Sequence, residues 1–283
     1  MANATGSVSS PGLGVGNVVG DCFSLTFKNL LKVAAVVALP FLIIGVLGAA
    51  VFGAGMMTGG TDLEAMLDGV TADPLQLGLM LVLYMVVVSF LICFVFAAGV
   101  RLYFDLKVDG RASILSAYRS GLARAVPLFI VNVVFMIILI IALGLPMALF
   151  AAIDVPALGL LLLPAFLYLG GVMAPLAPAV VIETRWISAI GRSIQLTKDY
   201  RWPIVGALLL MYLIMFGISL VALPIAAMFA FAGVIGIVLA AIANVAINVL
   251  IYGLLIALLT VIYTRLREIK EGTSIESVAG IFD

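Results

Sequence analysis

The sequence contains no histidine, and its 283 residues include only two cysteines, Cys22 and Cys93. Without histidine, and without a CxxC or similar ligand spacing, we expect no zinc site, no haem and no histidine-based acid catalysis. Charged residues are also scarce, at 10% of the chain, whereas a soluble domain has about 25%. The formal net charge is +0, so no basic surface for nucleic acid is expected. The sequence therefore predicts no cofactor, no metal and no nucleic-acid partner.

Apolar residues dominate instead, at 65% of the chain. Five stretches contain no charged residue, and they cover residues 33–61, 74–100, 125–153, 155–182 and 202–264. A helix of about 20 apolar residues crosses the hydrocarbon core of a bilayer. Each of the first four stretches is therefore long enough for one transmembrane helix, and the last is long enough for two helices with a turn at 224–236. The sequence predicts an all-α integral membrane protein with six transmembrane helices in one polytopic domain, residues 1–283.

The 14 basic residues alternate with the expected helices in a way that predicts orientation. They lie in four places: before the first expected helix, between the second and third, between the fourth and fifth, and after the sixth. The other three connections contain no Lys or Arg. In two of them every charged residue is acidic, namely Asp62, Glu64, Asp68 and Asp73 in one and Asp154 in the other. Basic residues near helix ends resist translocation. We therefore expect both termini in the cytoplasm, with both cysteines reduced.

Nothing at the start of the chain resembles a signal peptide, because its first charged residue is Asp21 and its first basic residue is Lys28. The chain is therefore expected to keep all its residues. The four acids between 62 and 73 match no EF-hand spacing, so this segment is interpreted as a solvated loop.

Short amphipathic segments precede the first, third and fifth expected helices. Their apolar residues recur at helical spacing over 15–30, 114–125 and 186–194, and polar residues occupy the opposite face. We interpret each segment as a helix at the cytoplasmic surface of the membrane. Two roles remain open for these helices, namely an elbow that turns the chain into the membrane and a sensor of lipid packing. The aromatic residues Trp186, Trp202 and Tyr103 are interpreted as interface anchors.

Shared residues indicate an internal repeat. GDCFSLT at 20–26 aligns with GRSIQLT at 191–197, and LYFDLKVDGRASI at 102–114 corresponds to IYTRLREIKEGTSI at 262–275. The predicted unit is an interfacial amphipathic helix followed by a membrane hairpin, used three times. The three pseudo-repeats cover 14–104, 112–183 and 186–266, between a flexible N-terminus (1–13) and a cytoplasmic tail (267–283).

Few polar groups are expected deep inside the membrane. Asn132 lies in the third expected helix, and Asn244 and Asn248 lie four residues apart on one face of the sixth. These three asparagines form a candidate intramembrane polar face, which lines a cavity or bonds a neighbouring helix. The fourth expected helix carries Pro164, Pro175 and Pro178, which predict kinks. Glycines such as Gly45, Gly48, Gly170 and Gly171 predict close helix contacts.

Two segments, 177–202 (APAVVIETRWISAIGRSIQLTKDYRW) and 262–272 (IYTRLREIKEG), resemble a known family. It is the membrane-domain family associated with glycerophosphodiester phosphodiesterases, whose stand-alone members include YciC-like inner-membrane proteins. The positions that carry the resemblance are Glu183, Ala189, Arg192, Ser193, Leu196, Tyr263, Leu266, Arg267, Lys270, Glu271 and Gly272.

The resemblance implies a multi-pass protein of the bacterial cytoplasmic (inner) membrane. It implies no phosphodiesterase activity, because that activity belongs to a separate soluble barrel with histidine catalysts, and this chain has neither.

Charged residues beside the expected helix ends supply the second candidate site. Glu183, Arg192, Arg267 and Glu271 are expected to form either an ion-pair cluster that joins the repeats or a site for an anionic lipid headgroup. No catalytic residue is expected. The leading hypothesis is a non-enzymatic scaffold or accessory component, with membrane lipids and a membrane-protein partner or a second copy of the chain as partners. The alternative is a carrier or flippase-like protein for a lipid or small apolar solute.

Overall fold

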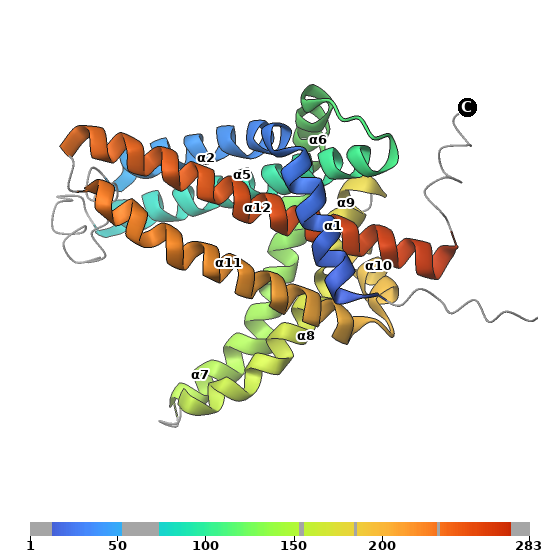
Figure 1. Cartoon of the computed structure of the whole chain (residues 1–283). Coiled ribbons are helices and arrows are strands. Elements are labelled where there is room, and N and C mark those ends of the chain that lie inside the picture. Colours follow the sequence, from blue (N-terminus) through green and yellow to red (C-terminus); the bar gives the residue numbers. More distant parts are fainter. Residues whose placement is uncertain (1–12, 53–73, 153–155, 184–185, 231–232, 273–283) are drawn as a thin grey trace, which may run out of the picture.

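Helices account for every regular element of the described residues in the computed structural model (Figure 1). The structure describes residues 13–52, 74–152, 156–183, 186–230 and 233–272. Six helical segments are long and apolar enough to cross a membrane, and they cover 30–48, 78–108, 114–150, 163–182, 201–222 and 238–271. The predictions of an all-helical chain and of six such helices are confirmed.

Four long helices run alongside one another and form the larger part of the molecule (Figure 1). They are α2 (Leu30–Phe52), α5 (Pro74–Val108), α11 (Arg201–Ala230) and α12 (Gly233–Glu271). Helix α12 packs against the other three. Its second half is buried on successive turns, with Leu254, Leu258 and Ile262 each at 0% exposure. The C-terminal half of α12 is therefore the centre of the core.

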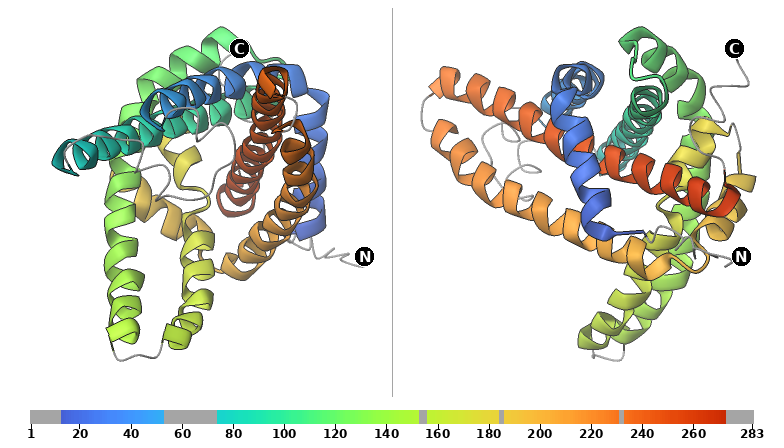
Figure 2. Two further views of the ribbon diagram at one scale, coloured as in Figure 1. Left: turned by 90° about the vertical axis from the view of Figure 1, so that its left-hand side faces the viewer. Right: turned by 45° about the vertical axis from the view of Figure 1, so that its right-hand side comes forward.

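The chain between α5 and α11 forms a second part that extends away from the four long helices (Figure 2). It consists of α6 (Ile114–Leu139), the π-helical turn η1 (Ile140–Gly144), α7 (Leu145–Ala152), the 3-10 helix η2 (Pro156–Leu162), α8 (Leu163–Met173) and α9 (Leu176–Ile182). Helix α6 packs along α5, and α8 packs against α11. Pro175 lies between α8 and α9, where its missing N–H interrupts the helix.

Two short helices cover the core near the C-terminal half of α12. Helix α1 (Val15–Lys28) lies across α12 (Figure 1) and buries Val18 and Cys22 at 0% exposure. Asn29 ends α1, and its side chain donates to the carbonyl of Leu25 at 3.1 Å. The other short helix, α10 (Ser188–Thr197), packs on α8, α9 and α12. Helix α1 thus buries its apolar face against this same chain, whereas α10 buries Ala189 and Leu196 and leaves Ile194, and Ile187 just before the helix, exposed at 41% and 58%.

The structure corrects the prediction for the second amphipathic segment. Residues from Ile114 onward belong to α6, which continues without a break to Leu139. The first and third segments are separate helices, but the second is the first part of a long one. The interruption predicted by the prolines lies in the fourth helix, between α8 and α9, as expected.

Several single-residue expectations also change. Tyr103 is not an interface anchor, because it is 1% exposed and its hydroxyl lies 3.0 Å from that of Thr26. Pro224 lies inside α11 rather than in a turn, and residues 231–232 of the expected turn lie outside the described residues. Leu13 is 6% exposed and packs in the core, so it does not belong to a flexible N-terminus. Helix α12 extends to Glu271, so the expected tail begins as helix.

Glycines contribute to close contacts, but not at all of the expected positions. A Cβ on Gly171 would lie 2.6 Å from Cγ2 of Val205, so this glycine permits α8 to approach α11. Gly45 and Gly170 have no atom within 4 Å of such a Cβ, so they are not contact positions. Gly121 is a contact that the sequence did not single out, since its Cβ would lie 2.7 Å from that of Ala98.

Two glycines end the longest helices in the same way. Gly110 follows α5 with φ of +63°, and Gly272 follows α12 with φ of +64°. These left-handed conformations favour glycine and commonly terminate helices. Each glycine follows an acidic residue in the two segments that the sequence analysis aligned.

Candidate functional site

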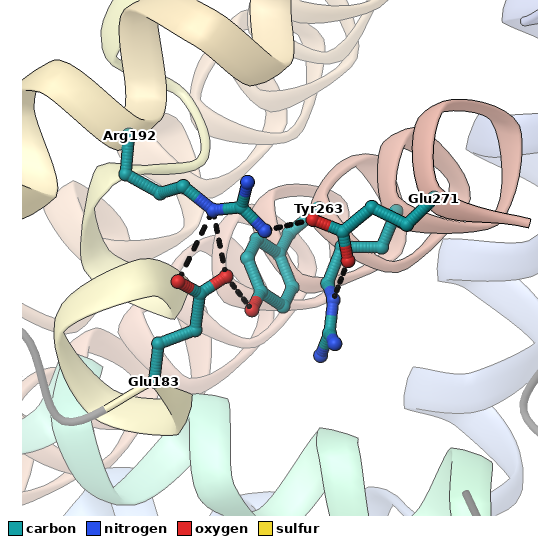
Figure 3. Close-up of polar contacts among 5 residues, drawn as sticks. Glu183, Arg192, Tyr263 and Glu271 are labelled. Atoms are coloured by element: carbon teal, nitrogen blue, oxygen red, sulfur yellow. Dashed lines mark hydrogen bonds and ion pairs between the residues drawn. The ribbon is translucent and has the colours of Figure 1, made fainter. Parts of the chain in front are cut away.

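The four charged residues predicted as a cluster are joined by ion pairs, and Figure 3 shows how Glu183, Arg192 and Glu271 point toward one another. Glu183 caps the C-terminus of α9, and Arg192 projects from α10. Arg267 and Glu271 lie four residues apart on the last turns of α12. Three helices that are distant in sequence therefore meet at this cluster, which we call the Arg192 cluster and which also includes Tyr263.

Arg192 joins two carboxylates from different helices. Its Nε donates to both carboxylate oxygens of Glu183, at 3.1 Å each, and its Nη2 donates to Oε1 of Glu271. Arg267 Nε donates to the other oxygen of Glu271 at 3.0 Å. The hydroxyl of Tyr263 donates to Oε1 of Glu183 at 2.9 Å (Figure 3). Glu183 and Glu271 are thus each held by two donors.

The Arg192 cluster is partly shielded from solvent, which strengthens its ion pairs. The side chains of Glu183 and Arg192 are 12% and 20% exposed, and those of Arg267 and Glu271 are both 26% exposed. Partial burial lowers the pKa of Arg192, but the bonds from Glu271 and Glu183 outweigh this effect and leave the pKa above its ordinary value. Arg192 therefore stays charged.

The chemistry available to the Arg192 cluster is limited by this mutual pairing. Two carboxylates and two guanidinium groups balance in charge, and the phenol of Tyr263 already donates to Glu183. Within the described residues, no group of three or more His, Cys, Asp or Glu side chains is placed to hold a metal ion. The arrangement is suited to joining α9, α10 and α12.

The candidate asparagines lie in two different places. Asn132 of α6 donates to Sγ of Cys93 on α5 at 3.8 Å. On α12, Nδ2 of Asn248 donates to the carbonyl and to Oδ1 of Asn244, at 2.8 and 2.9 Å. Asn244 is exposed. Among the described residues no hydrogen bond joins Asn132 to the other two.

A second group of polar contacts, which the sequence analysis did not anticipate, ties α1 and α5 to α12. Arg265 Nη2 lies 2.6 Å from Oδ2 of Asp21, and Lys107 Nζ donates to Thr264 at 2.6 Å. Lys107 also lies 4.0 Å from Glu268. The only signal in the sequence was the tyrosine, leucine and basic residue shared by 102–114 and 262–275. We call the region that contains these contacts and the Arg192 cluster the charged end.

Both cysteines are free and buried in the described part of the chain. Cys22 donates to the carbonyl of Val18 at 2.9 Å. Burial and, to a smaller extent, the charge of Asp21 raise the pKa of the Cys22 thiol from 9.0 to about 12. The thiol therefore stays protonated, which suits a packing role.

The expected acidic loop and Asp154 lie outside the described residues. Comparison of the chain with protein-family models, with curated proteins and with solved structures found no match.

Proposed function

We propose that this protein is a non-enzymatic component of a bacterial inner membrane that acts as a scaffold or accessory subunit in membrane organisation or in a larger complex. Six helices long and apolar enough to cross a bilayer support the membrane location. Exposed side chains on these helices are largely apolar, for example Leu31, Val46 and Leu83, at 87%, 69% and 65% exposure. Such surfaces suit lipid or another membrane helix.

The observation that carries the proposal is how the charged residues pair at the charged end. The carboxylates of Glu183 and Glu271 are held by guanidinium groups and a phenol, which favours joining helices over chemistry. A catalytic acid or base needs a proton that it exchanges with substrate. Residues paired in this way instead make a rigid surface from α9, α10 and α12, to which a partner protein can bind.

The proposed arrangement places both termini in the cytoplasm and treats the six spans as three hairpins. Helices α1 and α10 would lie at the cytoplasmic surface as elbows rather than lipid sensors. The buried apolar face of α1 supports this role, as does the packing of α10 on α8, α9 and α12. The matching left-handed glycines, Gly110 and Gly272, support a repeat that relates the first hairpin to the third. The likeness to YciC-like membrane proteins in segments 177–202 and 262–272 supports the bacterial inner membrane.

The experiment that tests the scaffold role is extraction of the intact protein in native lipid particles, followed by mass spectrometry of the proteins and lipids that copurify. A stoichiometric protein partner, or a second copy of the chain, is the expected result. Arg192→Ala should reduce partner recovery, whereas Arg119→Ala, at an exposed arginine of α6, should not. Recovery of the protein as a monomer with lipid alone would contradict the scaffold proposal.

A second candidate, a carrier or flippase-like protein for a lipid or small apolar solute, is favoured by a different observation. The part of the chain between α5 and α11 contains the π-helical turn η1, the 3-10 helix η2 and the break at Pro175. Interrupted membrane helices are frequent at transport sites. Transfer of a fluorescent lipid between the leaflets of protein-containing vesicles would support this candidate, and Pro175→Ala should slow the transfer. Transfer no faster than in protein-free vesicles would exclude it.

A further inference from the structure

Arg201, the first residue of α11, differs from four other arginines in having no ion pair with any carboxylate of the described residues. Those four, each paired with Asp or Glu, are Arg101, Arg192, Arg265 and Arg267. Within the described residues, the polar contact made by Arg201 is donation from Nη1 to the hydroxyl of Tyr168 on α8. Its Nε is buried and has no hydrogen-bond partner there. A buried N–H without an acceptor is unfavourable, so this guanidinium group is suited to an additional acceptor.

The nearest acid in sequence, Asp199, forms its ion pair with another cation. Asp199 has φ of +73°, a left-handed conformation that is uncommon for residues other than glycine. Its Oδ2 lies 3.0 Å from Nζ of Lys270, and this hydrogen bond lowers the pKa of Asp199. The ammonium of Lys270 also lies 5.7 Å from the ring centroid of Tyr200. Asp199 therefore pairs with Lys270. Arg201 and the exposed Lys198, three residues apart in sequence, form no ion pair with a carboxylate of the described residues.

An exposed aromatic residue and an apolar surface lie next to these cations. Trp202 is 68% exposed, and its ring centroid lies 6.3 Å from that of Tyr168. Farther along the same face of α11, at helical spacing, are Leu209, Leu213 and Phe216, at 45%, 60% and 62% exposure. Tryptophan prefers the headgroup level of a bilayer. The order along α11 is thus cation, tryptophan and apolar surface, which is also the order of groups in a phospholipid from phosphate to acyl chain.

We infer that Arg201, Lys198, Tyr168 and Trp202 form a binding site for an anionic phospholipid. The phosphate accepts hydrogen bonds from the guanidinium group of Arg201, whose planar donors suit phosphate oxygens. One acyl chain lies along the exposed apolar face of α11. Two cations that form no ion pair in the described part of the chain favour an anionic lipid over a zwitterionic one. The site is separate from the Arg192 cluster, and it can exist whether the protein is a scaffold or a carrier.

The chain allows a direct test because it contains only two tryptophans. In a Trp186→Phe background, Trp202 is the sole tryptophan and reports on lipid beside the site. The protein is reconstituted in phosphatidylcholine vesicles with a minor fraction of phosphatidylglycerol that carries brominated acyl chains, which quench tryptophan. The expected quenching corresponds to enrichment of phosphatidylglycerol beside Trp202 by roughly fivefold over its bulk fraction, the ratio expected for one cation near anionic lipid. Equal quenching by brominated phosphatidylcholine at the same fraction would overturn the inference.

Variants assign the enrichment to the guanidinium group. Arg201→Gln is expected to return quenching to the level set by the bulk fraction, and Arg201→Lys to retain part of the enrichment because it keeps the charge. The matched control Arg119→Gln, at an exposed arginine of α6, should leave the enrichment unchanged. Undiminished enrichment in Arg201→Gln would overturn the inference. Should that variant lose its helical circular dichroism spectrum, the comparison of the two lipids in the parent protein still decides.

A soluble phosphate compound presents the same oxygens to Arg201, so the two sources are distinguished in the same vesicles. Excess inorganic phosphate is expected to leave the quenching unchanged, because it gains nothing from the apolar face of α11. Loss of the enrichment on addition of inorganic phosphate would overturn the assignment to a lipid.

Discussion

At the scale of single residues, Arg192 makes the contacts on which the Arg192 cluster depends. It pairs with Glu183 and with Glu271, and all three side chains are at most 26% exposed. Arg192→Ala would leave two shielded carboxylates with fewer donors, and unpaired buried charges are strongly destabilising. We expect the free energy of unfolding to fall by about 1–3 kcal/mol. Thermal unfolding of the protein in lipid particles measures this effect as a lower Tm.

The matched control for Arg192 is Arg119→Ala on α6, where the side chain is exposed. Surface substitutions of this kind usually change stability little, so its Tm should stay close to that of the parent protein. An unchanged Tm for Arg192→Ala, together with a loss of bound lipid, would favour the headgroup role of the Arg192 cluster over the structural one.

Cys22 gives a prediction about reactivity, since burial raises the pKa of its thiol to about 12. The thiolate is the reactive form. With this pKa, only about one Cys22 side chain in ten thousand is ionised at pH 8. In a Cys93→Ala background we expect slow labelling of Cys22 by a soluble maleimide and fast labelling after unfolding. The folded state holds the Cys22 proton more tightly than the unfolded state does. The free energy of unfolding is therefore unaffected by this thiol at neutral pH and falls as the pH rises from 9.0 toward 12.

The control for this experiment lies on the exposed face of the same helix. In a cysteine-free background, Ser24→Cys should react quickly without unfolding, because Ser24 is exposed on α1. Equal native labelling rates at positions 22 and 24 would show that α1 does not pack on α12 as described.

The residue scale also shows where sequence reasoning was effective and where it stopped. The resemblance in 177–202 and 262–272 singled out Glu183, Arg192, Arg267 and Glu271, and the structure brings them together. The sequence did not indicate that Tyr103 is buried, because an amphipathic aromatic residue near a helix end looks the same at an interface and in a core. Its neighbour Thr26, which contacts the Tyr103 hydroxyl, is 77 residues away in sequence.

At the scale of helices, the crossing of α5 and α6 depends on Gly121. A Cβ there would lie 2.7 Å from Cβ of Ala98 and 3.1 Å from its Cα and N. The backbone of α5 cannot yield as a flexible side chain would, so Gly121→Ala should force the helices apart. We expect a loss of about 1–3 kcal/mol in unfolding free energy, the usual range for overpacking, measured as a lower Tm in lipid particles.

Gly217 provides the comparison, because it lies within α11 and has nothing within 4 Å of a Cβ. Alanine is the better helix former, so Gly217→Ala should keep or slightly raise the Tm. A Tm for Gly121→Ala as high as that of Gly217→Ala would contradict the close approach of α5 and α6.

The same scale explains why two of the three amphipathic segments are separate helices and one is not. Asn29 ends α1, with its side chain bonded to a backbone carbonyl, and Asp199 lies in a left-handed turn after α10. The segment that begins at Ile114 has no such residue before the membrane helix, and α6 continues through it. Apolar periodicity is identical in a continuous helix and in one that turns at an elbow, so the repeat alone predicted three separate helices.

At the scale of the whole molecule, the number of spanning helices followed from composition because membrane insertion depends on summed hydropathy. The stretch 202–264 holds no charge and contains most of α11 and α12. Which helices meet could not be derived in this way. Apolar residues surround each helix on all sides, so hydrophobicity does not distinguish a lipid-facing position such as Val46, at 69% exposure, from a buried one such as Val36, at 0%. Specific contacts between distant residues decide the arrangement, for example Gly171 with Val205.

Orientation in the membrane is the remaining whole-molecule prediction, and it rests on charge. The ion pairs at the charged end link Asp21, Lys107, Arg192 and Arg265 to neighbouring helices, so these basic residues belong to one side. Because basic residues stay in the cytoplasm, Asp68 should lie outside. In a cysteine-free background, Asp68→Cys in intact cells should react with a membrane-impermeant maleimide, and Arg119→Cys should react only after the membrane is opened.

The reverse pattern would invert the molecule and place the charged end, with the proposed lipid site at Arg201, on the outer surface. Labelling of both positions from outside would require an even number of spans between them. The structure has one complete spanning helix in the described part of that interval, α5, so this outcome would show that α5 does not cross the membrane.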